Sequence, residues 1–242
     1  MKIKRDILIK FRIVIIVFVI ILFQYCKKNS DDSGGNNNEG TLNYEIEIDK
    51  DYRILKVTTN GFLITSYVYT DKTIEKECTF NGTVQFTEKY FLNASGLADS
   101  SVLTSYIPSF TSVTYYKYNP DNYLIYISIN KTTFKYQDGN CISSHDGTYG
   151  EFDVGNYYEY SSLPNYIDIE NFTGSYLGKL NKNLFTKMNH RGMMGGDISS
   201  TNYEYVLNSD GLVVQRTIIS SSNPDYKEIS NFKYKYVGQP LK

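Results

Sequence analysis

Tyr203-Glu204-Tyr205-Val206-Leu207-Asn208-Ser209-Asp210-Gly211-Leu212-Val213-Val214 is the stretch that decides the fold of this 242-residue chain. Two-residue alternation places Tyr203 and Tyr205 on one face of a strand and Glu204 on the other. Asn208 to Gly211 has turn chemistry, because Asn and Asp side chains bond the local backbone and glycine accepts a positive φ. The residues from Leu212 onward are β-branched or aliphatic and suit a second strand. The stretch therefore predicts a β-hairpin.

Weaker copies of this order recur along the chain. Tyr116-Lys117-Tyr118 precedes the turn residues 119–122, and Phe134-Lys135-Tyr136 precedes the turn residues 137–140. Asn60-Gly61 and Asn81-Gly82 are strong short-range hairpin signals. The spacing of these units, roughly 20 residues, favours a meander of hairpins that grew by duplication.

The chain is therefore predicted to be mainly all-β, a large curved antiparallel β-meander that is open or partly closed like a barrel. After residue 202 the meander resumes and ends with Ile229 to Val237. Before that point we expect strands near residues 42–48, 52–58, 62–70, 73–80, 83–92, 97–104, 112–118, 123–130, 132–137, 141–145 and 156–161.

Residues 163–194 break the pattern. Phe172, Tyr176, Leu180 and Leu184 recur every four residues, which is helical spacing. We expect one short helical insertion near 167–180, followed by a loop. The glycine-rich run 190–197 suits neither a helix nor a strand.

The first 25 residues have the pattern of a lipoprotein signal peptide. A basic start precedes an apolar run of 11 residues, Ile13 to Phe23, too short to span a bilayer comfortably. The run ends at Phe23-Gln24-Tyr25-Cys26, which resembles the bacterial lipobox, although Tyr25 stands where a small residue is usual. We expect Cys26 to be lipidated, and an uncleaved signal anchor is the alternative.

Residues 26–40 then form a flexible polar tether after the lipidated cysteine, because Lys27 to Gly40 holds no apolar residue. Residues 41–242 form a single β-sheet domain. The full chain has 25 basic and 26 acidic residues, and the leader removes five and one of these, so the mature chain carries a net charge of −5. An acidic chain without a basic block argues against nucleic acid as a partner.

The lipobox, the tether, the Tyr-x-Tyr hairpins and the segment Ile167 to Leu184 together resemble uncharacterised Bacteroidetes lipoproteins with a porin-like, YD-repeat-like fold. The resemblance covers most of residues 44–237. It implies a curved antiparallel sheet in an outer membrane lipoprotein, and it implies no catalytic residues. Lys27 followed by Asp31 and Asp32 looks like the surface-export signal of this group, which favours surface exposure over a periplasmic location. Neither face of residues 62–70 is cleanly apolar, so we expect a tethered sheet in water rather than a lipid-embedded barrel.

Cys78 and Cys141 are left for a disulfide in an oxidising compartment, or for two buried thiols. No cysteine spacing of the metal-binding type occurs, and we expect neither a metal nor a cofactor. His145 follows Ser143 and precedes Asp146, and His190 precedes Asp197, so each histidine could serve an envelope hydrolase. A polar hairpin tip and a surface loop are the simpler interpretations of the two sites.

The tyrosines are the remaining candidates, since aromatic rings with a polar tip suit ligand platforms as well as sheet packing. Three functions follow: a non-enzymatic binding or scaffold module for a glycan or an envelope protein, a hydrolase centred on His145 or His190, or a purely structural repeat. The membrane is the expected partner through the lipid. The tyrosines that could face a ligand are Tyr116, Tyr118, Tyr158, Tyr160, Tyr203 and Tyr205.

Overall fold

The structure, a computed structural model, describes residues 41–149, 154–166, 175–192 and 196–235. All of them belong to the unit Gly40–Lys242. The leader, the tether and Cys26 lie outside the described residues, as does most of the predicted helical insertion.

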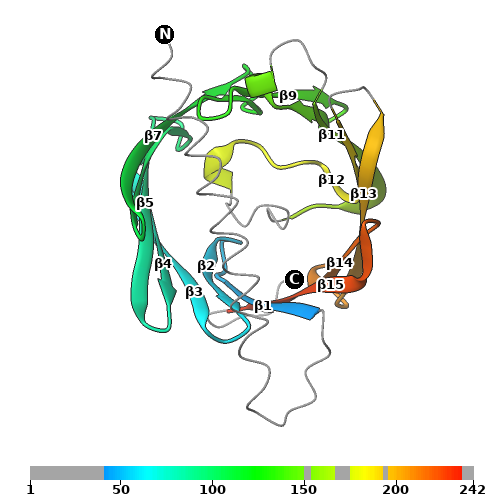
Figure 1. Cartoon of the computed structure of the whole chain (residues 1–242), viewed down its shortest axis with the longest axis horizontal. Helices are drawn as coiled ribbons and strands as arrows, with labels where there is room; N and C mark the ends of the chain where they lie inside the picture. Colours follow the sequence, from blue (N-terminus) through cyan, green and yellow to red (C-terminus); the bar gives the residue numbers. More distant parts are fainter. Residues whose placement is uncertain (1–40, 150–153, 167–174, 193–195, 236–242) are drawn as a thin grey trace. The chain divides into compact units, whose positions relative to one another are not determined.

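Fifteen strands form one closed barrel in which almost every strand pairs with its neighbours in sequence (Figure 1). The all-β prediction is confirmed, and the sheet is fully closed. The strands are β1 (Thr41–Ile48), β2 (Ile54–Thr59), β3 (Leu63–Tyr69), β4 (Thr73–Phe80), β5 (Thr83–Leu92), β6 (Ala98–Tyr106), β7 (Ser109–Tyr118), β8 (Leu124–Ile127), β9 (Thr132–Gln137), β10 (Asn140–His145), β11 (Gly155–Pro164), β12 (Asn183–Arg191), β13 (Asp197–Leu207), β14 (Val213–Ser220) and β15 (Asn223–Tyr234).

The barrel closes through a parallel seam between its first and last strands. Successive strands of a meander alternate in direction, so strands 1 and 15 of an odd-numbered set run the same way. They pair from Thr41 opposite Lys227 to Ile48 opposite Tyr234. The ion pairs Glu45–Lys233 and Glu47–Lys235 lie along this seam.

Four hairpins use the same five-residue turn, Asp49–Arg53, Asn93–Leu97, Asn119–Tyr123 and Asn208–Leu212. In each, the Oδ1 atom of the first residue accepts hydrogen bonds from the backbone N–H groups of the third and fifth residues, at 2.9–3.1 Å. The fourth residue has a positive φ in every copy. The turn of the opening stretch is thus a repeated structural unit.

Two-residue turns join other strand pairs. Asn60-Gly61 and Asn81-Gly82 have positive φ at both positions, which is the type I′ geometry expected of them. Asp138-Gly139 adopts the same geometry between β9 and β10.

The hydrophobic core lies inside the barrel. Alternation points one face of each strand inward, and the buried members include Ile46, Ile48, Ile74, Leu184 and Phe232. Charged side chains are exposed on the opposite face of many strands, among them Glu45, Glu75, Lys117, Lys135, Glu159, Glu204 and Lys227. The barrel therefore has an apolar, tyrosine-rich interior and a polar exterior.

The segment 175–182, which precedes β12 and which we call the inner strap, lies within the ring of strands (Figure 1). It begins with a short 3-10 turn, η2 (Ser175–Leu177). Of the predicted helical insertion 167–180, the structure describes residues 175–180, and 178–180 are not helical. Gly178 has a φ of +109°, which helical residues do not adopt, and a Cβ at this position would lie 3.0 Å from the carbonyl oxygen of Asn122. Beyond this turn, the strap backbone bonds to the barrel, through the N–H groups of Lys179 and Lys182.

The loop predicted after the helix is wrong between Asn183 and Arg191, because this stretch forms strand β12. Phe185, Met188 and His190 share the inner face through their partners Tyr160, Tyr158 and Asn156. Register shifts in the β11–β12 pair break the two-residue period on which strand recognition depends. The final strand also starts at Asn223, earlier than predicted.

Candidate functional site

All six predicted tyrosines lie on the inner face of the barrel. Tyr118 donates its hydroxyl hydrogen bond to the Ala98 carbonyl at 2.8 Å, Tyr160 to Cys141 at 2.6 Å, and Tyr205 to Phe185 at 2.8 Å. These rings pack and bond within the barrel wall instead of forming an exposed platform.

The remaining three tyrosines also have partners inside. The Tyr116 hydroxyl lies 2.9 Å from the Ser101 hydroxyl, and the Tyr158 hydroxyl lies 2.9 Å from that of Ser144. The Tyr203 ring meets Phe185 edge to face at 4.3 Å between centroids.

Several inner tyrosine hydroxyls bind backbone carbonyls at bulges in the sheet. Tyr69 and Tyr234 repeat the pattern, donating to the carbonyls of Ile54 and Val213 at 2.8 and 2.9 Å. Each of the five acceptors lies on the preceding strand, at or beside a register shift in the hairpin that contains it. A bulge interrupts the ladder, and a buried carbonyl needs a donor. In all five cases, the tyrosine two residues after another aromatic residue therefore supplies a hydrogen-bond donor where the ladder is irregular.

A polar network lies inside β4 to β7. Lys76 and Glu88 form an ion pair at 3.6 Å, with side chains 22% and 15% exposed. Ser101, which is buried, donates to Glu88 at 3.0 Å and contacts Tyr116. Burial of the network raises the pKa of the Tyr116 hydroxyl to about 12.

The inner strap covers this region. The Tyr176 ring is 4% exposed and meets the Tyr90 ring edge to face at 4.8 Å. Burial, the largest cause, raises the pKa values of both hydroxyls far above their ordinary range. Further along the strap, the N–H groups of Lys179 and Lys182 donate to the carbonyls of Asn122 and Gly139 at 2.8 and 2.9 Å.

His145 lies beside Ser143, with 3.2 Å between Nε2 and the hydroxyl oxygen. This distance suits a base and a nucleophile, but Ser143 is only 3% exposed. The Asp146 carboxylate accepts from the backbone and hydroxyl of Thr148. A substrate cannot reach the buried hydroxyl, so this geometry does not favour the hydrolase alternative.

His190 faces the barrel interior. Its Nδ1 atom lies 2.9 Å from Oδ1 of Asn156. Asp197 lies instead opposite Arg191 across the β12–β13 pair, with 3.7 Å between the carboxylate and Nε of Arg191. His190 and Asp197, named together as hydrolase candidates, thus make their contacts with different residues.

Cys78 on β4 and Cys141 on β10 are both buried and are not joined by a disulfide. Five strands separate them in the sheet order, whereas a disulfide needs Cα atoms about 4.4–6.8 Å apart. Burial raises the pKa of the Cys78 thiol, and the Cys141 thiol donates to the Ser143 carbonyl at 3.4 Å. Across the described ranges, no group of three or more His, Cys, Asp or Glu side chains could hold a metal ion.

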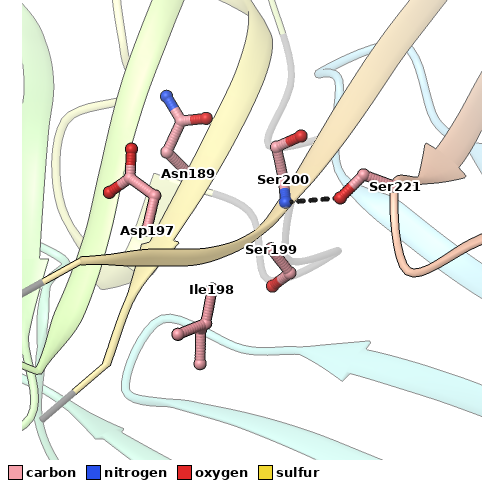
Figure 2. A pocket seen from close by; sticks show the side chains of 6 residues that line it. All are labelled: Asn189, Asp197, Ile198, Ser199, Ser200 and Ser221. Atoms are coloured by element: carbon pink, nitrogen blue, oxygen red, sulfur yellow. Dashed lines mark hydrogen bonds between the residues drawn. The ribbon is translucent and has the colours of Figure 1, made fainter. Parts of the chain in front are cut away.

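An open depression lies on the barrel at the end of the β12–β13 hairpin (Figure 2). Its volume is about 270 Å³, and its lining is mostly polar. Ser221, from the turn before β15, accepts a hydrogen bond from the Ser200 N–H at 2.8 Å. The lining residues are Asn189, Asp197, Ile198, Ser199, Ser200 and Ser221.

The contacts of the depression hold several of its polar groups in place. The Asn189 amide donates to the Glu159 carboxylate at 3.1 Å. Asp197 is 56% exposed, and Ile198 is 66% exposed beside it. The Arg191 guanidinium stacks on the Tyr157 ring at 4.2 Å from its centroid, next to Asp197. The depression therefore combines amide, carboxylate and hydroxyl groups with an apolar side chain.

Of the six lining residues, the sequence pointed only to Asp197, and in another role. Residues 183–202 carry no recognisable motif, and their alternation is interrupted by the register shifts around β12. Only the pairing of β12 with β13 brings Asn189 opposite Ser200.

No protein-family profile matches the chain, and no curated protein matches it in sequence. Among solved structures it is similar to a porin-like protein from Bacteroides uniformis, with 16% identity and a TM-score of 0.47. The similarity covers 75% of this chain and 83% of that one. In the described residues, no helix is both long enough and apolar enough to cross a membrane.

Proposed function

We propose that this chain is a lipid-anchored envelope protein without catalytic activity, whose barrel sits in water and binds a glycan on its outer wall. The observation that carries the proposal is the outward charge. A lysine or arginine on the lipid face costs about 2–4 kcal/mol at the bilayer midplane. Exposed charges such as Glu75, Lys117 and Lys135 would each be costly in lipid, so water is the favoured surrounding of the wall.

The anchor in this proposal is Cys26, and residues 27–40 are the tether. Each acyl methylene buried in lipid contributes ~0.8 kcal/mol, so two chains suffice for stable attachment. Intact-mass analysis of the mature protein tests this part. A diacylated species that begins at Cys26 is expected, and an unmodified amino terminus at Met1 would remove the anchor.

The ligand site in this proposal is the depression of Figure 2. Sugar hydroxyls both donate and accept, which matches the Asn189 amide, the Asp197 carboxylate and the hydroxyls of Ser200 and Ser221. Ile198 provides an apolar side chain for the C–H face of a sugar ring. The inner tyrosines, by contrast, are engaged in packing.

The test is a glycan array probed with the full acylated protein in lipid nanodiscs, followed by titration of any hit. Asn189→Ala and Asp197→Ala should each weaken binding at least tenfold, about 1.4 kcal/mol. Asn202→Ala and Glu204→Ala are the matched controls, since both side chains are exposed on β13 outside the depression. Undiminished binding by both depression variants, or recovery of a cleaved glycan, would refute the proposal.

A further inference from the structure

The outer wall also holds an apolar face, formed by Phe91, Val102, Val113, Tyr115 and Ile129. Val102 on β6 lies opposite Val113 on β7. In the neighbouring row, Ser100 on β6 is paired with Phe91 on one side and with Tyr115 on the other. Ile129 follows Ser128, whose hydroxyl accepts from the Tyr115 N–H at 2.7 Å. Four of the five are well exposed, at 41% for Phe91, 47% for Val113, 59% for Tyr115 and 46% for Ile129.

The strands around this face carry few charges. Strands β6 to β9 contain one acidic residue, Asp99, and two basic residues, Lys117 and Lys135. The Lys117 ammonium lies 5.3 Å from the centre of the Tyr126 ring. At the other border, Lys89 is paired with Glu75 at 2.7 Å. In an acidic mature chain, this side is therefore apolar and carries a net charge of +1 along its strands, two lysines less one aspartate.

We propose that this apolar face rests on the surface of the lipid bilayer. Contiguous exposed apolar side chains mark interaction surfaces, and tyrosine beside lysine suits the boundary between lipid and water. The anionic surface of a membrane would repel the acidic sides of the barrel and accept this one.

The proposal rests on the lipid anchor proposed above. A flexible tether of 14 residues has a typical end-to-end distance of about 20 Å, so the barrel would stay beside the bilayer. At that effective concentration, even a weak contact is occupied for much of the time. Six strand steps separate β7 from β13, so the depression would lie on a different side of the barrel from the membrane contact.

The chain contains no tryptophan, which permits a single-tryptophan test. Tyr115→Trp places the reporter on the apolar face, and Val206→Trp is the matched control, because Val206 is 52% exposed on β13. Each full acylated variant is reconstituted into anionic vesicles that contain brominated lipid. The indole fluorescence of Tyr115→Trp should be quenched several-fold more than that of Val206→Trp.

A second pair of measurements separates the outcomes. Adding Val113→Ser to Tyr115→Trp should reduce the quenching while circular dichroism remains unchanged. Equal quenching of the two single-tryptophan variants, in protein that floats with the vesicles, would overturn the docking alone. Protein that does not float would overturn the anchor and the docking together. If the indole of Tyr115→Trp is shielded from an aqueous quencher but not quenched by lipid, the face belongs to a protein partner and the proposal is overturned.

Discussion

Gly211 has a φ of +79° as the fourth residue of its turn, a backbone conformation that costs an L-residue about 1 kcal/mol or more. An added Cβ would meet no atom within 4 Å, so packing neither adds to this cost nor offsets it. Gly211→Ala should therefore lower the free energy of unfolding by about 1 kcal/mol, measured by urea denaturation.

Ser209→Ala is the control for this substitution, because it lies in the same turn and is not among the positive-φ residues. Its free energy of unfolding should stay within about 0.5 kcal/mol of the wild type. Equal losses for both variants would show that φ at residue 211 does not set the cost.

A substitution at Tyr205 tests whether the hydrogen bonds from inner tyrosine hydroxyls to bulge carbonyls stabilise the barrel. Tyr205→Phe removes the donor to the Phe185 carbonyl at 2.8 Å and leaves that acceptor without this bond inside the barrel. A buried group that loses its partner costs about 1–3 kcal/mol, so thermal and urea unfolding should both show a clear loss. Tyr115→Phe is the matched control because Tyr115 is 59% exposed on the outer wall, and it should be nearly neutral. A neutral Tyr205→Phe would mean that the bond contributes nothing.

The sequence predicted the conformation of individual turn residues best. Asn60-Gly61 and Asn81-Gly82 have the turn geometry that their chemistry predicts, because φ at these positions depends on local sterics alone. The sequence did not show whether Tyr205 points into the barrel or into water, because barrel closure decides which side of a strand becomes the interior. The six tyrosines were accordingly recognised as candidates but not as interior residues.

Among the elements, the inner strap and strand β12 show where local patterns fail. The four-residue spacing of Tyr176, Leu180 and Leu184 resembles a helix, yet Tyr176 packs on Tyr90 and Leu184 belongs to β12. Tertiary contacts with the barrel override the local preference of such a segment. The depression depends on the same strand, so missing β12 also meant missing Asn189 as a site residue.

Tyr176 is expected to carry much of the stability of the strap. Tyr176→Ala removes a ring that is 4% exposed within the core cluster, and such a loss of aromatic packing costs about 3–5 kcal/mol. Hydrogen exchange should also rise at Lys179 and Lys182, whose N–H groups bond the barrel turns. Tyr166→Ala is the control, because Tyr166 is 50% exposed at the other end of the same connection. Unchanged protection of Lys179 would show that Tyr176 does not hold the strap in place.

For the molecule as a whole, the buried tyrosines predict alkaline unfolding. Burial raises the pKa of Tyr116 to about 12 and raises those of Tyr44, Tyr69, Tyr90 and Tyr118 further. The unfolded value is about 10, so the unfolded chain releases these protons first. The stability is fully present below about pH 10 and falls as the pH rises through about 12. Circular dichroism and tyrosinate absorbance should change together in this window, and tyrosinate formation in a folded barrel would contradict the expectation.

Closure of the whole barrel depends on the seam between β1 and β15, which holds Ile46 and Ile48, both fully buried. Deletion of Thr41–Ile48 leaves 14 strands, an even number, so β2 and β15 could in principle pair antiparallel. That narrower barrel would lose the packing of both isoleucines, and replacing one buried isoleucine by alanine already costs about 2–5 kcal/mol of stability. It would also have to enclose the same tyrosines and the inner strap in a smaller interior. We therefore expect open edges at β2 and β15, and aggregation on size-exclusion chromatography. The double variant Glu45→Gln with Lys233→Gln keeps the strand and should elute like the wild type, since exposed ion pairs contribute about 0–1 kcal/mol. A deletion variant that elutes without aggregates and shows a cooperative thermal transition would show instead that the remaining strands close on their own.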